Sequence, residues 1–256
     1  MPLVELDPNE LRLTAERLER RISERFPGSG LSQRAVDLQD LLDRLRARAD
    51  EVAEPIAWVR ALYVVLAVVV IIGLTAVPID LSATEELTTV GWVQFVEALV
   101  NDLVLLGAGI AFLTTLETRI KRRRALRELH EIRSFAHVID MMQLTKDPQH
   151  LVDTPELRTE ASPTNDLDAY ELGRYLDYCS ELLAVSAKGA AMIAQRFDDP
   201  AVLAAVNELE NLTTGLSRKI WQKLMVLAAA HPEAAGGQPS TKATDSRNSD
   251  SQTPSS

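Results

Sequence analysis

IAWVRALYVVLAVVVIIGLTAVPI, residues 56–79, is the stretch that decides how this chain folds. From Ala61 to Pro78 it carries no charged side chain. A helix rises ~1.5 Å per residue, so about 20 residues cross a hydrocarbon core of ~30 Å. A second apolar stretch, WVQFVEALVNDLVLLGAGIAFLTTL, follows at Trp92–Leu116. The sequence therefore predicts a transmembrane hairpin, residues 56–117, with spans at about 56–79 and 93–116.

The composition excludes several classes of protein. A net charge of −10 argues against a nucleic-acid-binding protein, which needs surplus Lys and Arg to displace counterions from phosphates. The single cysteine, Cys179, leaves no partner for an internal disulfide and no cysteine cluster for a metal. Residues 1–31 are charged and lack the apolar core of a cleavable signal peptide. The first apolar helix is therefore expected to serve as the insertion signal.

Positive charges flank the hairpin and predict its orientation. Between Ala61 and Thr118 there is no Lys or Arg, and the connecting loop carries only acidic charges. Because Lys and Arg near membrane ends mark the cytoplasmic side, both termini are expected in the cytoplasm. The cluster at 121–124 is interpreted as this topology signal, although anionic lipid headgroups would also fit it. The flanking cations are Arg44, Arg46, Arg48 and Arg60 before the hairpin, and Arg119, Lys121, Arg122, Arg123, Arg124 and Arg127 after it.

Polar residues in the second span are candidate functional residues. Gln94, Glu97 and Asn101 share one helix face, and Asp102 lies beside them. A carboxylate at mid-membrane costs about 2.5–3.5 kcal/mol on the insertion scale, so such residues often mark a functional site. Three interpretations stay open. The stretch 92–100 lies at the outer interface, the side chains make polar contacts between helices, or they line a path for an ion or proton.

Residues 1–55 are expected to form a helical hairpin that precedes the first span. Asp7–Phe26 has an N-cap, Asp7, followed by Pro8, and its apolar side chains recur every three or four residues. Pro27–Gly30 ends this helix, and a second begins at about Ser32. Either the two helices pack on each other, or a heptad pattern joins several chains in a coiled coil. That pattern leads without a break into the first span: Leu31, Ala35, Leu38, Leu42, Leu45, Ala49, Val52 and Ile56.

Residues 118–230 are expected to form a cytoplasmic helical bundle, which makes the whole protein all-α. The second span continues as one long helix to about Thr145 and is followed by a loop at 147–165. Helices follow from about Asp166 to Phe197 and from Ala201 to about Ala229. Cys179 lies in the apolar stripe of the first of these and is expected in the core. Residues 231–256 have almost no apolar content and are expected to be disordered.

His130, His137 and Asp140 form a second candidate site, on the cytoplasmic part of the long helix. The two histidines are seven residues apart, and Asp140 follows His137 by three, so all lie on neighbouring parts of one face. The favoured interpretation is packing or surface hydrogen bonding; a metal site would need further ligands from His150 or Asp147. No metal-binding motif is present. No cofactor is expected.

The last helix ends in a basic patch. Arg218, Lys219 and Lys223 surround Trp221. Cations suit the C-terminal half of a helix, and this is the favoured interpretation. The patch would also suit contact with lipid or an acidic partner.

Three segments resemble a group of bacterial membrane proteins of unknown function. They are RSFAHVIDMMQLTKDP at Arg133–Pro148, RYLDYCSELL at Arg174–Leu183 and NELENLTTGLSRKIWQKL at Asn207–Leu224. The resemblance implies a bacterial inner-membrane location and supplies no activity. Members of the group often carry His where this chain has Met142, which implies that a His137, Asp140 and His ligand set is broken here.

Three functions are consistent with this sequence. The first is a non-enzymatic membrane protein whose cytoplasmic bundle binds an unknown protein partner, with the lipid bilayer and a homo-oligomer as further partners. The second is a small oligomeric ion channel that uses the polar residues of the second span. The third is an enzyme built on His130, His137 and Asp140, for which the sequence offers no catalytic motif. The first is favoured.

Overall fold

The computed structural model describes residues 5–53, 56–76, 89–148, 151 and 167–232, and every regular element in this part of the chain is a helix. The predicted all-α fold class is therefore confirmed for these residues. The acidic loop, most of the 147–165 loop, His150 and the tail beyond residue 232 lie outside them. The helices are α1 (Pro8–Arg25), α2 (Gly30–Ala53), α3 (Ala57–Ala76), α4 (Thr89–Leu144), α6 (Ala169–Arg196) and α7 (Pro200–Ala230).

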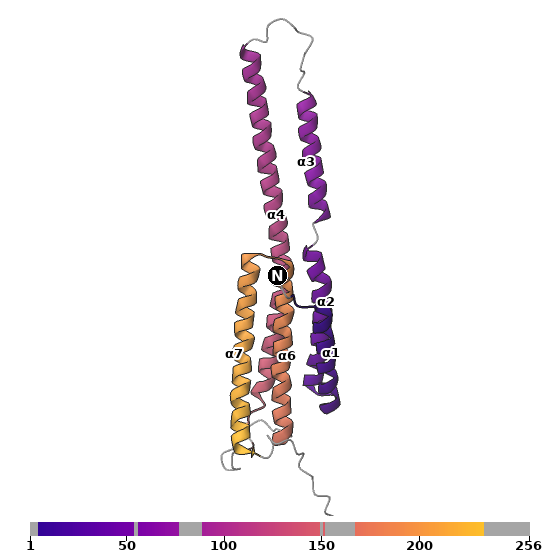
Figure 1. The fold of residues 1–256 in the computed structure, drawn as a ribbon, viewed down its shortest axis with the longest axis vertical. Helices are drawn as coiled ribbons and strands as arrows, with labels where there is room; N and C mark the ends of the chain where they lie inside the picture. Colours follow the sequence, from indigo (N-terminus) through magenta and orange to yellow (C-terminus); the bar gives the residue numbers. More distant parts are fainter. Residues whose placement is uncertain (1–4, 54–55, 77–88, 149–150, 152–166, 233–256) are drawn as a thin grey trace, which may run out of the picture.

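The helices divide the molecule into a bundle and a projecting pair (Figure 1). α1, α2, α6, α7 and the C-terminal half of α4 lie side by side in the bundle. α3 and the N-terminal half of α4 extend together beyond one end of it. Within the bundle, α6 contacts each of the other four helices, so it is the central element.

Apolar stripes on each bundle helix form one core. The stripe expected on the first helix is buried in full, with Leu11, Ala15, Leu18 and Ile22 at most 5% exposed. The Asp7 carboxylate caps α1 by accepting the Asn9 N–H at 2.8 Å. Gly28, whose φ of +68° suits a residue without a Cβ, lies in the turn to α2. α1 and α2 then pack on each other, as one of the two sequence interpretations has it.

The apolar stripe of α2 is covered within this chain. Leu31, Ala35, Leu38, Leu42 and Leu45 are all buried in the core that α1, α4 and α6 share. This part of the stripe needs no second chain to bury it, and an intermolecular coiled coil is not confirmed.

The predicted unbroken passage from the heptad stripe into the first apolar helix is not confirmed, because residues 54 and 55 lie outside the described part of the chain and Ile56 is not helical. α2 ends at Ala53 and α3 begins at Ala57. Pro55 lies between them in the sequence. Proline has no N–H to continue the helical ladder, and its ring disfavours helical geometry at the preceding residue.

α4 is the longest element and belongs to both parts of the molecule. Its 56 residues correspond to ~84 Å at ~1.5 Å per residue. It ends at Leu144, close to the predicted end at about Thr145. Its C-terminal half buries Ala125, Leu129, Ile132, Ala136 and Ile139 in the bundle core.

The projecting part exposes most of its apolar side chains. Within the described residues, one helical segment, Leu99–Leu144, is long and apolar enough to cross a membrane, and 6% of its most apolar window is buried. The apolar segment of α3 that the structure describes, Ala57–Ile72, is shorter. The exposed set includes Val64, Val65, Val68, Val69, Ile71 and Ile72 of α3, and Leu103, Val104, Leu105 and Phe112 of α4. This surface is consistent with membrane association.

α3 packs on α4 through a small second core. Ile56, Val59 and Leu113 are buried there, with Tyr63, Leu66 and Ile120 packed against them. Gly109 permits the close approach, since a Cβ at this position would lie 2.8 Å from Leu66 Cδ2. A Cβ at Gly107 would have nothing within 4 Å. Of these two glycines, Gly109 therefore serves the contact between α3 and α4.

Gly189→Leu is expected to lower the free energy of unfolding by about 1–3 kcal/mol, because it overpacks the core. A Cβ at Gly189 would lie 2.8 Å from Leu42 Cδ2, where α6 approaches α2. Gly215→Leu on α7 is the matched control, since a Cβ there would have nothing within 4 Å. Thermal unfolding followed by circular dichroism measures both. Equal midpoints for the two variants would contradict the close approach of α6 to α2.

Candidate functional site

The joint between the projecting pair and the bundle is held by polar side chains of α4. Glu117 Oε1 accepts the Ile56 N–H at 3.4 Å, which fixes the residue just before α3. Lys121 Nζ lies 3.1 Å from the same oxygen. Both side chains are mostly buried, at 20% and 15% exposure. Lys121, expected from the sequence to be part of a topology signal, therefore also stabilises the joint.

A second polar contact ties α4 to the turn between α6 and α7. Arg122 Nε donates to both carboxylate oxygens of Asp199, at 3.0 and 2.9 Å, and its Nη2 lies 2.8 Å from Oδ2. The buried Asp199 carboxylate also caps α7 by accepting the N–H groups of Ala201 and Val202. Arg122 and these N–H groups hold the pKa of Asp199 below its usual range. Asp199 thus both caps α7 and anchors α4.

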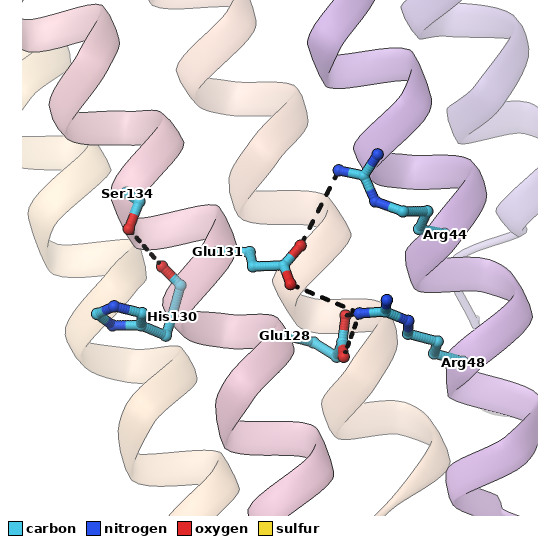
Figure 2. Close-up of polar contacts among 6 residues, drawn as sticks. All are labelled: Arg44, Arg48, Glu128, His130, Glu131 and Ser134. Carbon is cyan, nitrogen blue, oxygen red and sulfur yellow. Dashed lines mark hydrogen bonds and ion pairs between the residues drawn. The ribbon is translucent and has the colours of Figure 1, made fainter.

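The third contact joins α4 to α2 (Figure 2). Arg48 Nη1 donates to both oxygens of Glu128 at 2.8 Å and lies 3.5 Å from Glu131. Arg44 reaches the other side of Glu131, at 3.9 Å. Glu128 is only 5% exposed, so without Arg48 its charge would be buried and unpaired. This contact fixes the rotation of α4 relative to α2.

The C-terminal end of α4 is held by a lysine from α7. Lys223 Nζ donates to the carbonyl oxygen of Gln143, in the last turn of α4, at 2.6 Å and to that of Lys146, just beyond the helix, at 3.4 Å. Burial lowers the pKa of Lys223, since it removes water from the ammonium. Gln143 Nε2 donates to Asp140 Oδ1 at 2.7 Å, while its buried Oε1 has no partner among the described residues.

The structure separates the residues that the sequence placed in the basic patch of the last helix. Lys223 points into the bundle, so its predicted place in that patch is wrong. Arg218, Lys219 and Trp221 remain on the surface, and Trp221 is 60% exposed. Beside Trp221, a hollow of about 400 Å³ opens between α6 and α7. Its lining includes Asp177, Ser180, Thr214, Ser217 and Arg218.

The three polar residues of the second span lie on the projecting half of α4. Glu97 and Asn101 are exposed and Asp102 is half-exposed. None of the three forms an ion pair or a side-chain hydrogen bond with another described residue. The helix that carries them begins at Thr89, so it is already formed before Trp92. The side chain of Gln94 lies outside the described residues.

His130, His137 and Asp140 are not brought together as a site. Both histidines are exposed on the outer surface of α4, and the His130 ring points away from the Arg48 and Glu128 pair (Figure 2). The His130 backbone carbonyl accepts a hydrogen bond from Ser134 Oγ at 3.0 Å. Asp140 is engaged by Gln143. Across the residues that the structure describes, no three His, Cys, Asp or Glu side chains gather in a group that could hold a metal.

Cys179 lies in the core, as its place in the apolar stripe predicts. Burial raises the pKa of its thiol to about 12, so at neutral pH the reactive thiolate is scarce. The structure therefore gives Cys179 a packing role.

The buried polar residues were missed by sequence reasoning, although a signal for two of them exists. Lys223 interrupts the apolar stripe of α7 between Ile220 and Leu227, and Glu128 lies between Ala125 and Ile132 in the stripe of α4. A charged residue at a core position of a helix needs a partner. The sequence indicates that such a partner is needed but not which residue supplies it.

No family model, curated protein or solved structure matches this chain. The resemblance drawn from its sequence therefore stays a prediction.

Asp199→Asn is expected to lower the free energy of unfolding by about 1–3 kcal/mol at pH 7, because a charge-assisted hydrogen bond to Arg122 is lost. The folded-state pKa of Asp199 is lowered, so its stabilising effect is complete above the unfolded pKa of about 3.9. It is lost as the pH falls through the still lower folded value. The gap between wild type and variant should therefore close in acid, as measured by denaturant unfolding at a series of pH values.

Asp198→Asn is the matched control, since Asp198 is exposed and forms no ion pair with the residues that the structure describes. It should leave unfolding at pH 7 nearly unchanged. A loss equal to that of Asp199→Asn would show that the net charge of this turn, and not the Arg122 contact, governs stability.

Proposed function

We propose that this protein is a bacterial inner-membrane scaffold: α3 and the N-terminal half of α4 cross the bilayer, and the bundle docks a protein partner in the cytoplasm. The observation that carries the proposal is the course of α4. It passes without interruption from an exposed apolar half into the core of a closed bundle. A rigid passage of this kind suits a protein that holds a domain at the membrane surface.

Two features support a two-span arrangement. The described part of α3 packs beside α4 while the outward sides of both remain apolar and exposed, as lipid contact requires. α1 and α7 both lie in the bundle, at the same end of the projecting pair. This arrangement supports the proposal that both α1 and α7 lie on one side of the membrane, and the Lys and Arg residues at 119–127 favour the cytoplasmic side.

The surface proposed to receive the partner lies on the C-terminal half of α7. Arg218, Trp221 and Met225 recur at spacings of three and four and are all exposed, so they form one outward stripe. The hollow between α6 and α7 opens beside Trp221. An exposed tryptophan next to cations suits a segment with acidic and apolar side chains. The proposed partner is therefore an acidic protein segment.

A photo-crosslinking side chain in place of Met225 is expected to yield one discrete adduct in intact cells. Position 203, also exposed on α7 but near its N-terminal end, is the matched control and should yield none. Arg218→Glu should reduce the adduct at 225 severalfold, because it repels an acidic segment. Adduct formation is measured by the shift in mass on denaturing gels.

Equal adducts at positions 203 and 225, or an adduct at 225 that Arg218→Glu leaves unchanged, would contradict the docking surface. An adduct with the mass of two copies of this chain would assign the stripe to self-association instead.

A second candidate function is ion conduction by an oligomer. It is favoured by Glu97 and Asn101, which are exposed on the projecting half of α4 and uncovered by the described residues of α3. Polar groups in this position become favourable when further copies of the chain enclose them around water. Acidic residues around a pore select cations.

If the protein conducts, purified protein in proteoliposomes should pass potassium down a gradient, and Glu97→Gln with Asp102→Asn should lower that flux severalfold. Glu24→Gln, at an exposed position of the bundle, is the matched control and should leave the flux unchanged. Absence of flux from folded protein would rule out this second candidate and leave the scaffold proposal intact.

No catalytic step is proposed. His130 and His137 are exposed, and Asp140 is engaged with Gln143. Among the described residues, no group of three His, Cys, Asp or Glu side chains could hold a metal.

A further inference from the structure

Five of the six basic residues between Arg119 and Arg127 fall into two groups, and the sixth, Arg124, is also exposed. Lys121 and Arg122 are engaged with Glu117 and Asp199 and belong to the joint described above. Arg119, Arg123 and Arg127 recur every four residues, so they share one face of α4, and all three are exposed. These three residues are called the arginine stripe. The structure thus separates residues that the sequence presents as one cluster.

The charge of the arginine stripe is left uncompensated by the described part of the chain. None of its three guanidiniums forms an ion pair with a described residue. Glu117 is the only acidic residue of α4 between Leu103 and Arg127, and Lys121 and Ile56 already occupy its carboxylate. In a protein with a net charge of −10, such a local excess of positive charge indicates an external anion.

The arginine stripe lies just beyond the apolar part of α4, where lipid headgroups would surround a hairpin embedded in a membrane. Phe112 is 64% exposed and is the last large exposed apolar side chain of α4 before Arg119. From Arg119 to Arg127 the helix rises ~12 Å, and the headgroup region is roughly 5–8 Å thick on each side of the hydrocarbon core. Arginine side chains also extend toward the interface along their apolar stems. All three guanidiniums can therefore reach headgroup phosphates.

We propose that the arginine stripe binds the headgroup phosphates of anionic phospholipids in the cytoplasmic leaflet. The inference rests on the proposed membrane function and adds the class of lipid. The planar guanidinium binds phosphate oxygens through two parallel hydrogen bonds. A zwitterionic headgroup also offers a phosphate, but its ammonium cancels the net attraction. The stripe therefore distinguishes lipids by net charge.

The fluorescence of Trp58 can report which lipids lie near the arginine stripe. Trp58 is 51% exposed on α3, two residues beyond Ile56, whose N–H meets Glu117. Glu117 is in turn two residues from Arg119, so Trp58 lies about 6 Å along the helix axes from Arg119, the nearest residue of the arginine stripe. Trp92→Phe with Trp221→Phe leaves Trp58 as the only tryptophan of the chain.

The experiment uses vesicles of equal parts phosphatidylglycerol and phosphatidylcholine, in two preparations that carry brominated acyl chains on one lipid or on the other. Bromine quenches the fluorescence of Trp58 when it lies nearby, so the ratio of quenching in the two preparations measures which lipid surrounds Trp58. For the full-length protein this ratio is expected to favour phosphatidylglycerol over phosphatidylcholine about fivefold or more. One basic residue near an anionic surface already contributes about that factor. Arg119→Gln with Arg123→Gln and Arg127→Gln should lower this ratio severalfold, while the exposed Arg60 and Arg124 retain part of the preference. The same three positions changed to Lys should retain most of the preference.

The matched control changes three other exposed basic residues, Arg17, Arg20 and Lys188, to Gln, and should leave the ratio unchanged. Circular dichroism in the same vesicles verifies that each variant is folded. Equal quenching by the two lipids in the wild type, or a preference that the Gln variant leaves undiminished, would overturn the inference alone. Absence of quenching by either lipid would place Trp58 outside the bilayer and overturn the proposed membrane function as well.

Discussion

The structure depends on one constraint, which is that α4 has to be a single helix in two different surroundings. Its backbone hydrogen bonds are satisfied within the helix along its whole length, whatever surrounds it. The side chains then suit each half of the helix to its own surroundings. The N-terminal half presents apolar groups outward, and the C-terminal half turns Ala125, Ile132 and Ile139 into the bundle. The change from one pattern to the other occurs at the joint around Glu117 and Arg122.

Polar contacts fix how α4 is set in the bundle, while apolar packing supplies the bulk of the stability. Arg48 of α2, Asp199 of the turn between α6 and α7, and Lys223 of α7 contact α4 at three different heights. Each contact includes a group that is buried or lies at a helix end, so a rotation of α4 would leave such groups without partners. Apolar stripes alone would tolerate such rotation far better.

Much of the fold could be predicted from the sequence, because periodic apolar positions and caps are local signals. The buried stripe of α1, the end of α4 near Thr145, the core position of Cys179 and the cap at Asp199 follow from such signals. Which residues pair with each other across helices is not a local property of the sequence. Lys223 was assigned to a surface patch because only its neighbours along the helix were considered, whereas its partner carbonyl at Gln143 is 80 residues away in the sequence. The arginine stripe could likewise not be predicted, because only the folded structure shows which of several neighbouring cations are paired with acidic groups and which are exposed.

The uninterrupted α4 also has a mechanical consequence. Between Gly109 and Leu144 it contains neither Gly nor Pro, the residues at which helices usually bend. From Arg119 to Leu144 it measures ~38 Å, so a tilt of about 10° would carry its far end sideways by about 7 Å. Membrane helices adjust their tilt to the thickness of the bilayer around them. If the projecting pair crosses a membrane as proposed, the far end of the bundle, where Lys223 holds α4, moves sideways when the thickness of that membrane changes.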